Sequence, residues 1–327
     1  MKNTITDIAK IAGVAKSTVS RYLNGGSVSD ATRRKLDQVI QETGYTPNTF
    51  AQSLKAKKTN MIGAIVPRLD SFSASQSVTG LDEELRSQGY QLLIVNTSQD
   101  LIREIEALYD LARQKISGII LFATHVTEAH LTAIQEIEVP VILLGQQHPD
   151  VHSMVYDDYG AGYDVGQYIL NKGHKQIAYL GVTEKDVAVG VHRKQGFQDA
   201  IHERDDVVVN FYESGFKMSD AVIAASSILD QSNPSIIVCA TDNIALGVMK
   251  AAYMKGIRIP ERLSVTGFGG YDVTEVIHPS LTTVKYGYSQ SGRLAALNII
   301  KLVREESVQP LTILGYDFMD RESVDSV

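Results

Sequence analysis

Residues 5–24 have the sequence ITDIAKIAGVAKSTVSRYLN. The hydroxyl of Thr4 or Thr6 can accept a hydrogen bond from an unpaired N–H of a first helical turn, so we expect a helix that runs to about Gly13. Its apolar face would consist of Ile8, Ile11 and Ala12. The stretch therefore opens with a short capped helix that ends at a glycine, where the chain can turn sharply.

A second short helix is expected over residues 16–24. Val19 and Leu23 lie four residues apart and face inward, which leaves polar and basic side chains outside: Lys16, Ser17, Thr18, Ser20 and Arg21. Ser29 caps a third helix over residues 30–43, whose inward side chains are Leu36, Val39 and Ile40. Two short helices around a glycine-containing turn, the second rich in Ser, Thr, Lys and Arg, are typical of a helix-turn-helix. An ordinary helical subdomain with a solvated basic face is the alternative.

The charge of the chain is unevenly distributed. The net charge is −7, but residues 1–60 hold ten Lys and Arg against four Asp and Glu, a surplus of six positive charges. The remaining residues therefore carry −13. A small basic module on an acidic body is the pattern expected when one part meets phosphates and the rest does not.

Residues 5–24 resemble the signature of the lactose/galactose repressor (LacI/GalR) family of transcription regulators. The resemblance implies that Lys16, Ser17 and Arg21 contact bases in the major groove of operator DNA. It implies contacts with the phosphate backbone by Thr18, Ser20, Asn24, Ser29, Thr32, Tyr45 and Asn48. Helix-turn-helix modules usually bind paired half-sites, so we expect a homodimer on a near-palindromic double-stranded operator.

Residues 47–58, PNTFAQSLKAKK, have a polar composition that a plain linker would also show. The resemblance implies instead a hinge helix in which Leu54, beside the small Ala51, enters the minor groove and bends the DNA. The expected domains are a helix-turn-helix domain over 1–46, a hinge over 47–60 and a sugar-sensing core over 61–327.

The core alternates short apolar runs with amphipathic helical stretches, which predicts buried parallel strands between helices. The first set of runs comprises 62–66, 91–95, 118–122 and 141–144, and the second comprises 177–181, 206–209, 236–239 and 263–268. Two similar sets predict an α/β core of two doubly wound lobes. The resemblance implies periplasmic-binding-protein-like lobes and a chain that crosses between them, with lobe one at about 61–157 and 286–314 and lobe two at about 158–285 and 315–327.

Ligands of open parallel sheets bind beyond the carboxyl ends of the strands. The polar and aromatic residues that follow the predicted strands are the candidate effector site: Arg68, Ser71, Ser73, Gln146, Gln147, Arg193, Thr241, Asp242 and Tyr288. Amide and carboxylate groups suit sugar hydroxyls, aromatic rings suit the apolar ring faces, and arginine suits hydroxyls or a phosphate. Many family members carry an acidic residue where this chain has Gly269-Gly270, so the usual acidic sugar contact is absent at that point.

A narrower resemblance is to disaccharide-operon repressors of the sucrose and trehalose type, through Arg68-Leu69-Asp70-Ser71 and Tyr156-Asp157-Asp158. It implies a disaccharide or a phosphorylated disaccharide as effector, with a sucrose type preferred to a trehalose type. In a trehalose-type site Arg68 would favour a phosphorylated sugar. Gln146 stands where a further arginine could sit, which favours the neutral sugar.

Other function classes find little support in the sequence. The eight histidines show no paired spacing typical of a metal site, and there is no phosphate-binding loop or nucleophile elbow, so we expect no enzyme, metal or cofactor. Cys239 is the single cysteine and lies in an apolar run, which predicts a buried thiol. The absence of an apolar signal core or a stretch of about 20 apolar residues predicts a cytoplasmic protein without a membrane partner.

The lack of an apolar signal core and the basic N-terminus count against a stand-alone periplasmic-type sugar-binding protein. A regulator with the same head and a non-sugar effector, such as a purine, stays open. We expect the residues after Arg68 and the helix near residues 81–85 to contribute to a dimer interface, and the tail shows no heptad extension for a tetramer.

Overall fold

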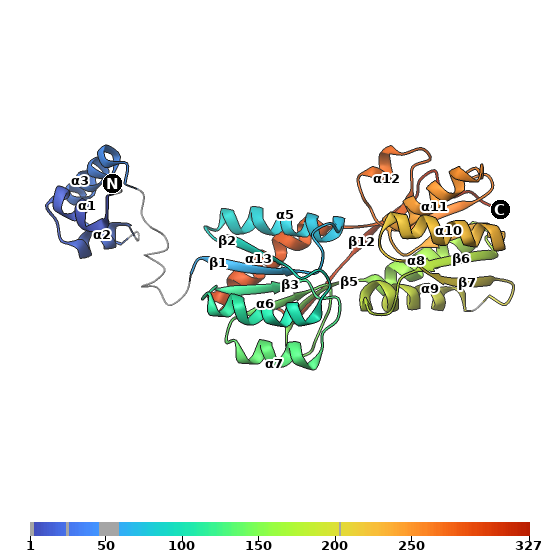
Figure 1. Cartoon of the computed structure of the whole chain (residues 1–327), viewed down its shortest axis with the longest axis horizontal. Coiled ribbons are helices and arrows are strands. Elements are labelled where there is room, and N and C mark those ends of the chain that lie inside the picture. Colours follow the sequence, from blue (N-terminus) through green and yellow to red (C-terminus); the bar gives the residue numbers. More distant parts are fainter. Residues whose placement is uncertain (1–2, 24–25, 46–58, 203) are drawn as a thin grey trace. The chain divides into compact units, whose positions relative to one another are not determined.

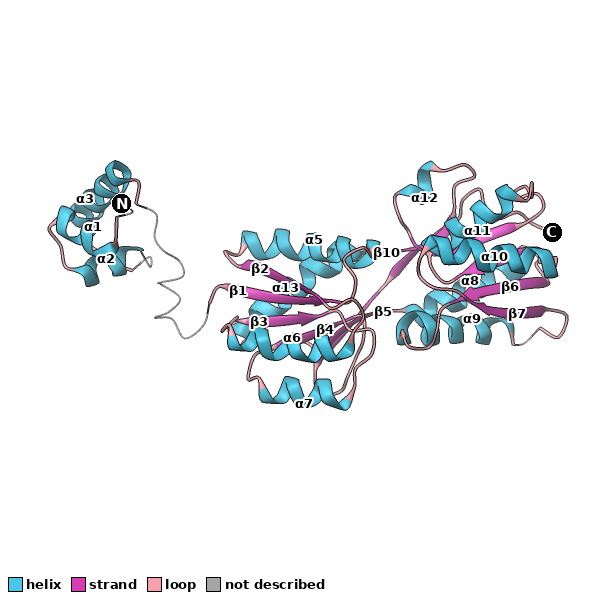
Figure 2. Cartoon of the chain, in the orientation of Figure 1, coloured by secondary structure: helices cyan, strands magenta, loops and turns pink. Residues whose placement is uncertain are grey.

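The computed structural model describes residues 3–23, 26–45, 59–202 and 204–327. The chain divides into two compact units, residues 1–59 and 60–327 (Figure 1). Figure 2 shows helices alone in the first unit, and two sheets with helices on both faces in the second.

The first unit is a bundle of three helices, α1 (Ile5–Ala12), α2 (Lys16–Leu23) and α3 (Asp30–Thr43). Thr4 caps α1, and its N–H donates to the Asp7 carboxylate at 2.8 Å. Gly13 has a φ of 61°, the left-handed conformation that lets the chain turn directly into α2. The bundle closes on side chains that are fully buried, Ile8, Ala12, Val19 and Leu36.

One prediction for the first helix is wrong. Ile11 is 53% exposed, whereas Ala9 is buried. The inward stripe of α1 follows positions 5, 8, 9 and 12, and this places Ile11 on the solvent side.

The second unit begins with a six-stranded parallel sheet of order β11-β5-β4-β3-β1-β2. Its strands are β1 (Met61–Val66), β2 (Gln91–Asn96), β3 (Gly118–Leu121), β4 (Val141–Leu144), β5 (His152–Tyr156) and β11 (Leu311–Leu314). One face packs against α5 (Phe72–Ser87) and α13 (Tyr288–Val303), and the other against α6 (Leu101–Arg113) and α7 (Glu128–Glu136). We call this sheet and its helices lobe one.

The second sheet has the order β12-β10-β9-β8-β6-β7, and we call it, with its helices, lobe two. Its strands are β6 (Gln176–Gly181), β7 (Val208–Glu213), β8 (Ile236–Cys239), β9 (Ser264–Gly269), β10 (Thr282–Tyr286) and β12 (Tyr316–Met319). Its helices are α8 (Asp158–Asn171), the π-helix Val187–Arg193, α9 (Lys194–Ile201), α10 (Met218–Gln231), α11 (Asp242–Met254) and the single turn α12 (Val273–Val276). Among the strands that the structure describes in this sheet, β12 alone runs antiparallel to its neighbour, β10.

The chain crosses between the lobes three times, after β5, after β10 and after β11. Each crossing leaves a single residue between the two elements that it joins, so strand ends of both sheets are held close together at the crossings (Figure 1). Cys239 is fully buried in lobe two, as its apolar neighbours predict. No helix in the described part of the chain is long and apolar enough to span a bilayer.

The strand predictions need two corrections. The strand predicted at 206–209 is β7, and it begins only at Val208, because the preceding residues form a turn in which the N–H of Val207 donates to the carbonyl of Arg204 at 3.2 Å. Four strands, β5, β10, β11 and β12, carry too mixed a set of side chains to have been predicted. The helix near residues 81–85 is part of α5, where Leu81 and Leu85 are fully buried in the core of lobe one and Glu83 is exposed; its contribution to a dimer interface stays a prediction.

Candidate functional site

The exposed side of α2 carries the predicted base-contacting residues. Lys16, Ser17 and Arg21 are all exposed, and Val19 on the opposite side of the helix is fully buried. Thr18 and Ser20 are half-buried beside them. The short helix thus presents two cations and hydroxyl groups to solvent, a set that can bind phosphates and the acceptor atoms of guanine.

The other predicted DNA contacts that the structure describes lie on α3 or next to its ends. Ser29 caps α3, and its hydroxyl accepts a hydrogen bond from the N–H of Thr32 at 3.4 Å. Tyr45 is half-buried against the core of the bundle. Four predicted residues lie outside the described part of the chain: Asn24, Asn48, Ala51 and Leu54.

A cavity of about 180 Å³ lies where the strand ends of the two lobes face each other, which is room for on the order of ten water molecules. Seven of the nine predicted effector residues line it: Arg68, Ser71, Ser73, Gln146, Arg193, Thr241 and Tyr288. They come from both lobes, because each follows a parallel strand or begins a helix at the same edge of its sheet.

The other two predicted residues do not line the cavity. Gln147 is exposed, because the turn after β4 directs only Gln146 inward. Asp242 is fully buried behind the residues that line the cavity. Its carboxylate accepts hydrogen bonds from the N–H of Tyr271 at 2.9 Å and the hydroxyl of Thr283 at 2.6 Å. Its oxygens are thus used by the protein rather than offered to a ligand.

Arg193 is the buried cation of the cavity. Its Nε and Nη2 donate to Oδ1 of Asp158 at 3.1 and 2.5 Å, and its Nη1 donates to the carbonyl of Ala240 at 2.5 Å. The hydroxyl of Tyr286 donates to the same Asp158 oxygen at 3.0 Å. The guanidinium also lies 4.7 Å from the centre of the Phe268 ring. This network fixes the direction of Arg193 before any ligand arrives.

Two carboxylates in the lining were not predicted as effector residues. Asp158 follows β5, so its position after a strand was the signal for it, although that strand was not predicted. Asp186 caps the π-helix and accepts a hydrogen bond from the N–H of Val189 at 3.1 Å. Burial raises the pKa of Asp186, because the cleft withdraws the carboxylate from water. Both can accept hydrogen bonds from hydroxyl groups.

Three tyrosines form an aromatic floor at the crossings between the lobes. The rings of Tyr156, Tyr286 and Tyr288 have centroids 5.1 to 5.8 Å apart. Burial raises the pKa of Tyr156 to about 12, and its hydroxyl lies 2.6 Å from that of Ser291. Aromatic faces beside fixed hydrogen-bonding groups are the combination that a sugar ring requires.

The two lobes contact each other beside the cavity, through partners of the lining residues Thr124 and Tyr271. The N–H of Val187 in lobe two donates to the carbonyl of Thr124 in lobe one at 3.4 Å. The rings of Phe72 in lobe one and Tyr271 in lobe two have centroids 4.3 Å apart. Across the described ranges, no group of three His, Cys, Asp or Glu is placed to hold a metal ion.

Two family models match the chain, one over each unit. Residues 4–48 match the bacterial regulatory proteins of the lacI family, and residues 59–322 match the periplasmic binding proteins and sugar binding domain of the LacI family. The chain belongs to the LacI family. It is therefore a DNA-binding transcription regulator rather than an enzyme, and the predicted family is confirmed.

Relatives of this LacI-family chain match it over nearly its whole length. It is 41% identical to the sucrose operon repressor of Staphylococcus xylosus, over 97% of this chain and 98% of that protein. It is 32% identical to the HTH-type transcriptional regulator TreR of Escherichia coli, over 93% of this chain and 95% of that protein.

Solved structures share the fold. The lac repressor dimer bound to operator and the anti-inducer ONPF superposes with a TM-score of 0.92 at 22% identity, with complete coverage of both chains. A complex of the transcriptional regulator CelR with cellobiose has a TM-score of 0.73 at 26% identity and covers 98% of this chain and 100% of that one. The predicted fold, a helix-turn-helix with two doubly wound lobes, is thereby confirmed.

Proposed function

We propose that this LacI-family chain represses a sugar-utilisation operon and is released from its operator by a disaccharide, with a sucrose type preferred to a trehalose type. The observation that carries the proposal is the cavity between the lobes, where Arg193, Asp158 and Asp186 lie beside an aromatic floor. The similarity to a sucrose operon repressor at 41% identity supports the sucrose type.

The cavity favours a neutral disaccharide over its phosphate. Arg68 is partly committed, because its Nε donates to Asp70 at 3.0 Å, and Gln146, which also belongs to lobe one, is a neutral group of the lining. Arg193 is already paired with Asp158. A phosphate would therefore find no unpaired arginine among these lining residues, whereas sugar hydroxyls can use the remaining donors and acceptors.

Release requires that the sugar prefer one arrangement of the lobes, since equal affinity for both arrangements shifts nothing. Ligand in the cavity would strengthen the closed arrangement, in which Val187 contacts Thr124. In the homodimer that we propose, closure would separate the two hinge segments and so weaken minor-groove contacts by Leu54. Such a regulator works in the cytoplasm, where its operator lies.

The test is fluorescence anisotropy at fixed salt, with a duplex that the wild-type chain selects from a random pool. Sucrose, trehalose and their 6-phosphates are titrated into the complex. We expect sucrose to release the duplex at the lowest concentration. Tight sugar binding without a change in operator affinity would refute the proposed repression, and release only by a 6-phosphate would refute the neutral effector.

Variants locate the DNA contacts. Arg21→Ala should reduce discrimination between the selected and a scrambled duplex by roughly tenfold, because a bidentate arginine contact with a base contributes about 1–3 kcal/mol. Arg113→Ala removes the same charge from an exposed position on α6 and is the matched control. Leu54→Ala should weaken binding to the selected duplex and leave the fold unchanged.

A further inference from the structure

The turn after β9 uses two glycines to direct a tyrosine into the cleft. Gly269 and Gly270 have φ angles of 145° and 66°, values that side chains with a Cβ rarely adopt. A Cβ on Gly269 would lie 2.3 Å from Cε1 of the Tyr271 ring. The Tyr271 ring thus occupies the space that a side chain at position 269 would need.

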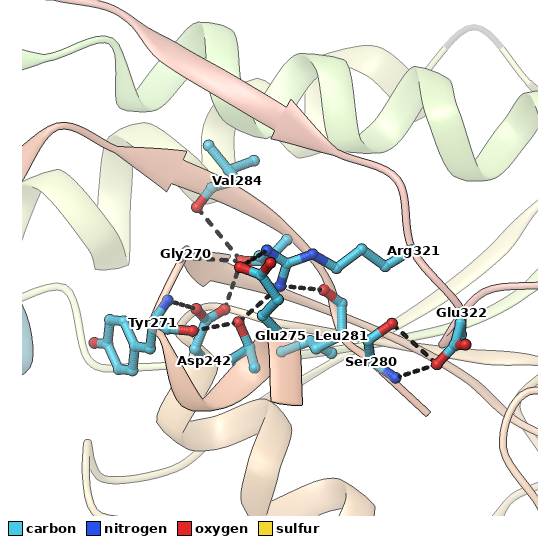
Figure 3. A network of polar contacts seen from close by, with 11 residues as sticks. Asp242, Gly270, Tyr271, Glu275, Ser280, Leu281, Val284, Arg321 and Glu322 are labelled. Carbon is cyan, nitrogen blue, oxygen red and sulfur yellow. Dashed lines mark hydrogen bonds and ion pairs between the residues drawn. The ribbon is translucent and has the colours of Figure 1, made fainter. Parts of the chain in front are cut away.

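Asp242 holds this turn from behind. Its Oδ2 accepts the N–H of Tyr271 at 2.9 Å, and the carbonyl of Tyr271 accepts the hydroxyl of Thr274 at 2.6 Å. Thr274 in turn accepts from Arg321 at 3.1 Å. Figure 3 shows the backbone of Tyr271 directed into this network and its ring directed away from it. Asp242 is therefore a positioning residue for Tyr271.

The Tyr271 ring forms a wall of the cavity. It is 8% exposed and lies against Phe72 of lobe one at 4.3 Å between ring centroids. Phe72 also makes an edge contact with Tyr288 at 6.3 Å. Within the described ranges, the hydroxyls of Tyr271 and Tyr288 make no hydrogen bond, although both residues line the cavity. The wall thus offers an aromatic surface and two hydroxyls that are available to a ligand.

We propose that Tyr271 is a specificity-determining residue of the effector site and that its ring recognises the apolar face of a sugar ring. The Tyr271 ring takes the place of a side chain at position 269, which would instead contact a sugar hydroxyl. The inference rests on the proposed function, because it takes the effector to be a sugar. A pyranose ring carries C–H groups on its faces, and these pack well against an aromatic surface. Phe72 belongs to the other lobe, so the wall is supported on both sides only when the cleft is closed.

The test uses the full chain, with sucrose and trehalose as probes in isothermal titration calorimetry. Tyr271→Ala should weaken sugar binding by roughly tenfold or more, because it removes the aromatic surface. Tyr271→Phe keeps that surface and should stay within about fivefold of wild type, the loss expected for one hydrogen bond. Tyr253→Ala is the matched control, because it removes an exposed ring of α11 and should leave both sugar affinity and operator affinity unchanged.

Gly269→Ala should displace the Tyr271 ring while keeping the tyrosine itself. The added Cβ meets Tyr271, so the ring must move and sugar affinity should fall as in Tyr271→Ala. Gly256→Ala is the matched control, because Gly256 also has a positive φ, 69°, but no atom lies within 4 Å of its added Cβ. This comparison separates displacement of the ring from backbone strain.

A spectroscopic measurement distinguishes ligand contact from a merely structural role. The chain contains no tryptophan, so tyrosines dominate its near-ultraviolet absorption. Sugar should produce a tyrosine difference spectrum that is reduced in Tyr271→Phe and unchanged in Tyr253→Phe, whose tyrosine is 78% exposed on α11.

Two results would overturn the inference. If Tyr271→Ala and Gly269→Ala bind both sugars as wild type does, the inference fails while the proposed function stands. If the wild-type chain binds its operator but neither sugar, the sugar assignment fails and the role of Tyr271 as a sugar contact fails with it.

Discussion

Replacing Asp158 by asparagine should destabilise lobe two strongly. Asp158 and Arg193 have side chains that are each 6% exposed, and Oδ1 of Asp158 accepts two hydrogen bonds from Arg193 and one from Tyr286. Asparagine removes the charge and leaves the buried guanidinium with only the carbonyl of Ala240 as a strong acceptor. Breaking a buried ion pair from one side costs about 3 kcal/mol or more. For a domain of this size, that loss lowers Tm by about 6–12 °C.

Differential scanning calorimetry at constant pH measures this loss. Asp206→Asn is the matched control, because it breaks an exposed ion pair with Lys175 and should leave Tm nearly unchanged. Adding Arg193→Met to Asp158→Asn removes the unpaired cation and should recover part of the loss. A Tm for Asp158→Asn within about 2 °C of wild type would refute the reasoning that the buried charge needs its partner.

Three further predictions concern pH, helix packing and capping. Burial raises the pKa of Asp242 to about 6 from 3.8. Because the folded-state pKa lies above the unfolded one, Asp242 stabilises the folded protein below about pH 4, and this stabilisation of about 3 kcal/mol is lost as the pH rises through about 6. Between pH 4 and about 6, Tm should therefore fall more steeply in wild type than in Asp242→Asn. Gly80→Ala should reduce the free energy of unfolding by roughly 1–3 kcal/mol and so lower Tm, because the added Cβ would lie 2.0 Å from the carbonyl oxygen of Ser289 on α13. Gly315→Ala should leave Tm unchanged, because no atom lies within 4 Å of its added Cβ, and equal Tm values for the two variants would contradict the close packing at Gly80. Ser29→Ala removes the cap of α3 and should cost the first unit about 1 kcal/mol, seen as faster amide exchange along α3 and contradicted by unchanged exchange.

The features that were predicted well depend on residues close together in the chain. The cap of α3 at Ser29 and its end at Thr43 depend on contacts within about four residues. The central strands β1, β3, β4 and β8 are uniformly apolar, which follows from burial on both faces. Strands at crossings and sheet edges have no such pattern, and β5, β10, β11 and β12 therefore went unpredicted.

The candidate effector site was predicted in part for the same reason. Strand-end position indicated Arg68, Gln146 and Arg193 correctly as cavity-lining residues. Strand-end position does not distinguish a side chain that faces the cavity from one that supports the residues around it. For that reason Asp242 was expected to contact the ligand. The Asp242 oxygens instead accept hydrogen bonds from Tyr271 and Thr283. The aromatic wall depends on a contact between the two lobes, which no local pattern in the sequence indicates.

The helix-turn-helix, the alternation of strands and helices, the segregation of charge and the family can be predicted from the amino-acid sequence alone, because each is encoded in local spacing or in a contiguous motif. The three-dimensional fold is needed to know which carboxylate pairs with Arg193, which one supports the glycine turn, and that Phe72 and Tyr271, almost 200 positions apart, form one wall. Those relations arise when three chain crossings bring the strand ends of two sheets together, and the direction of each side chain there is set by hydrogen bonds to residues distant in sequence.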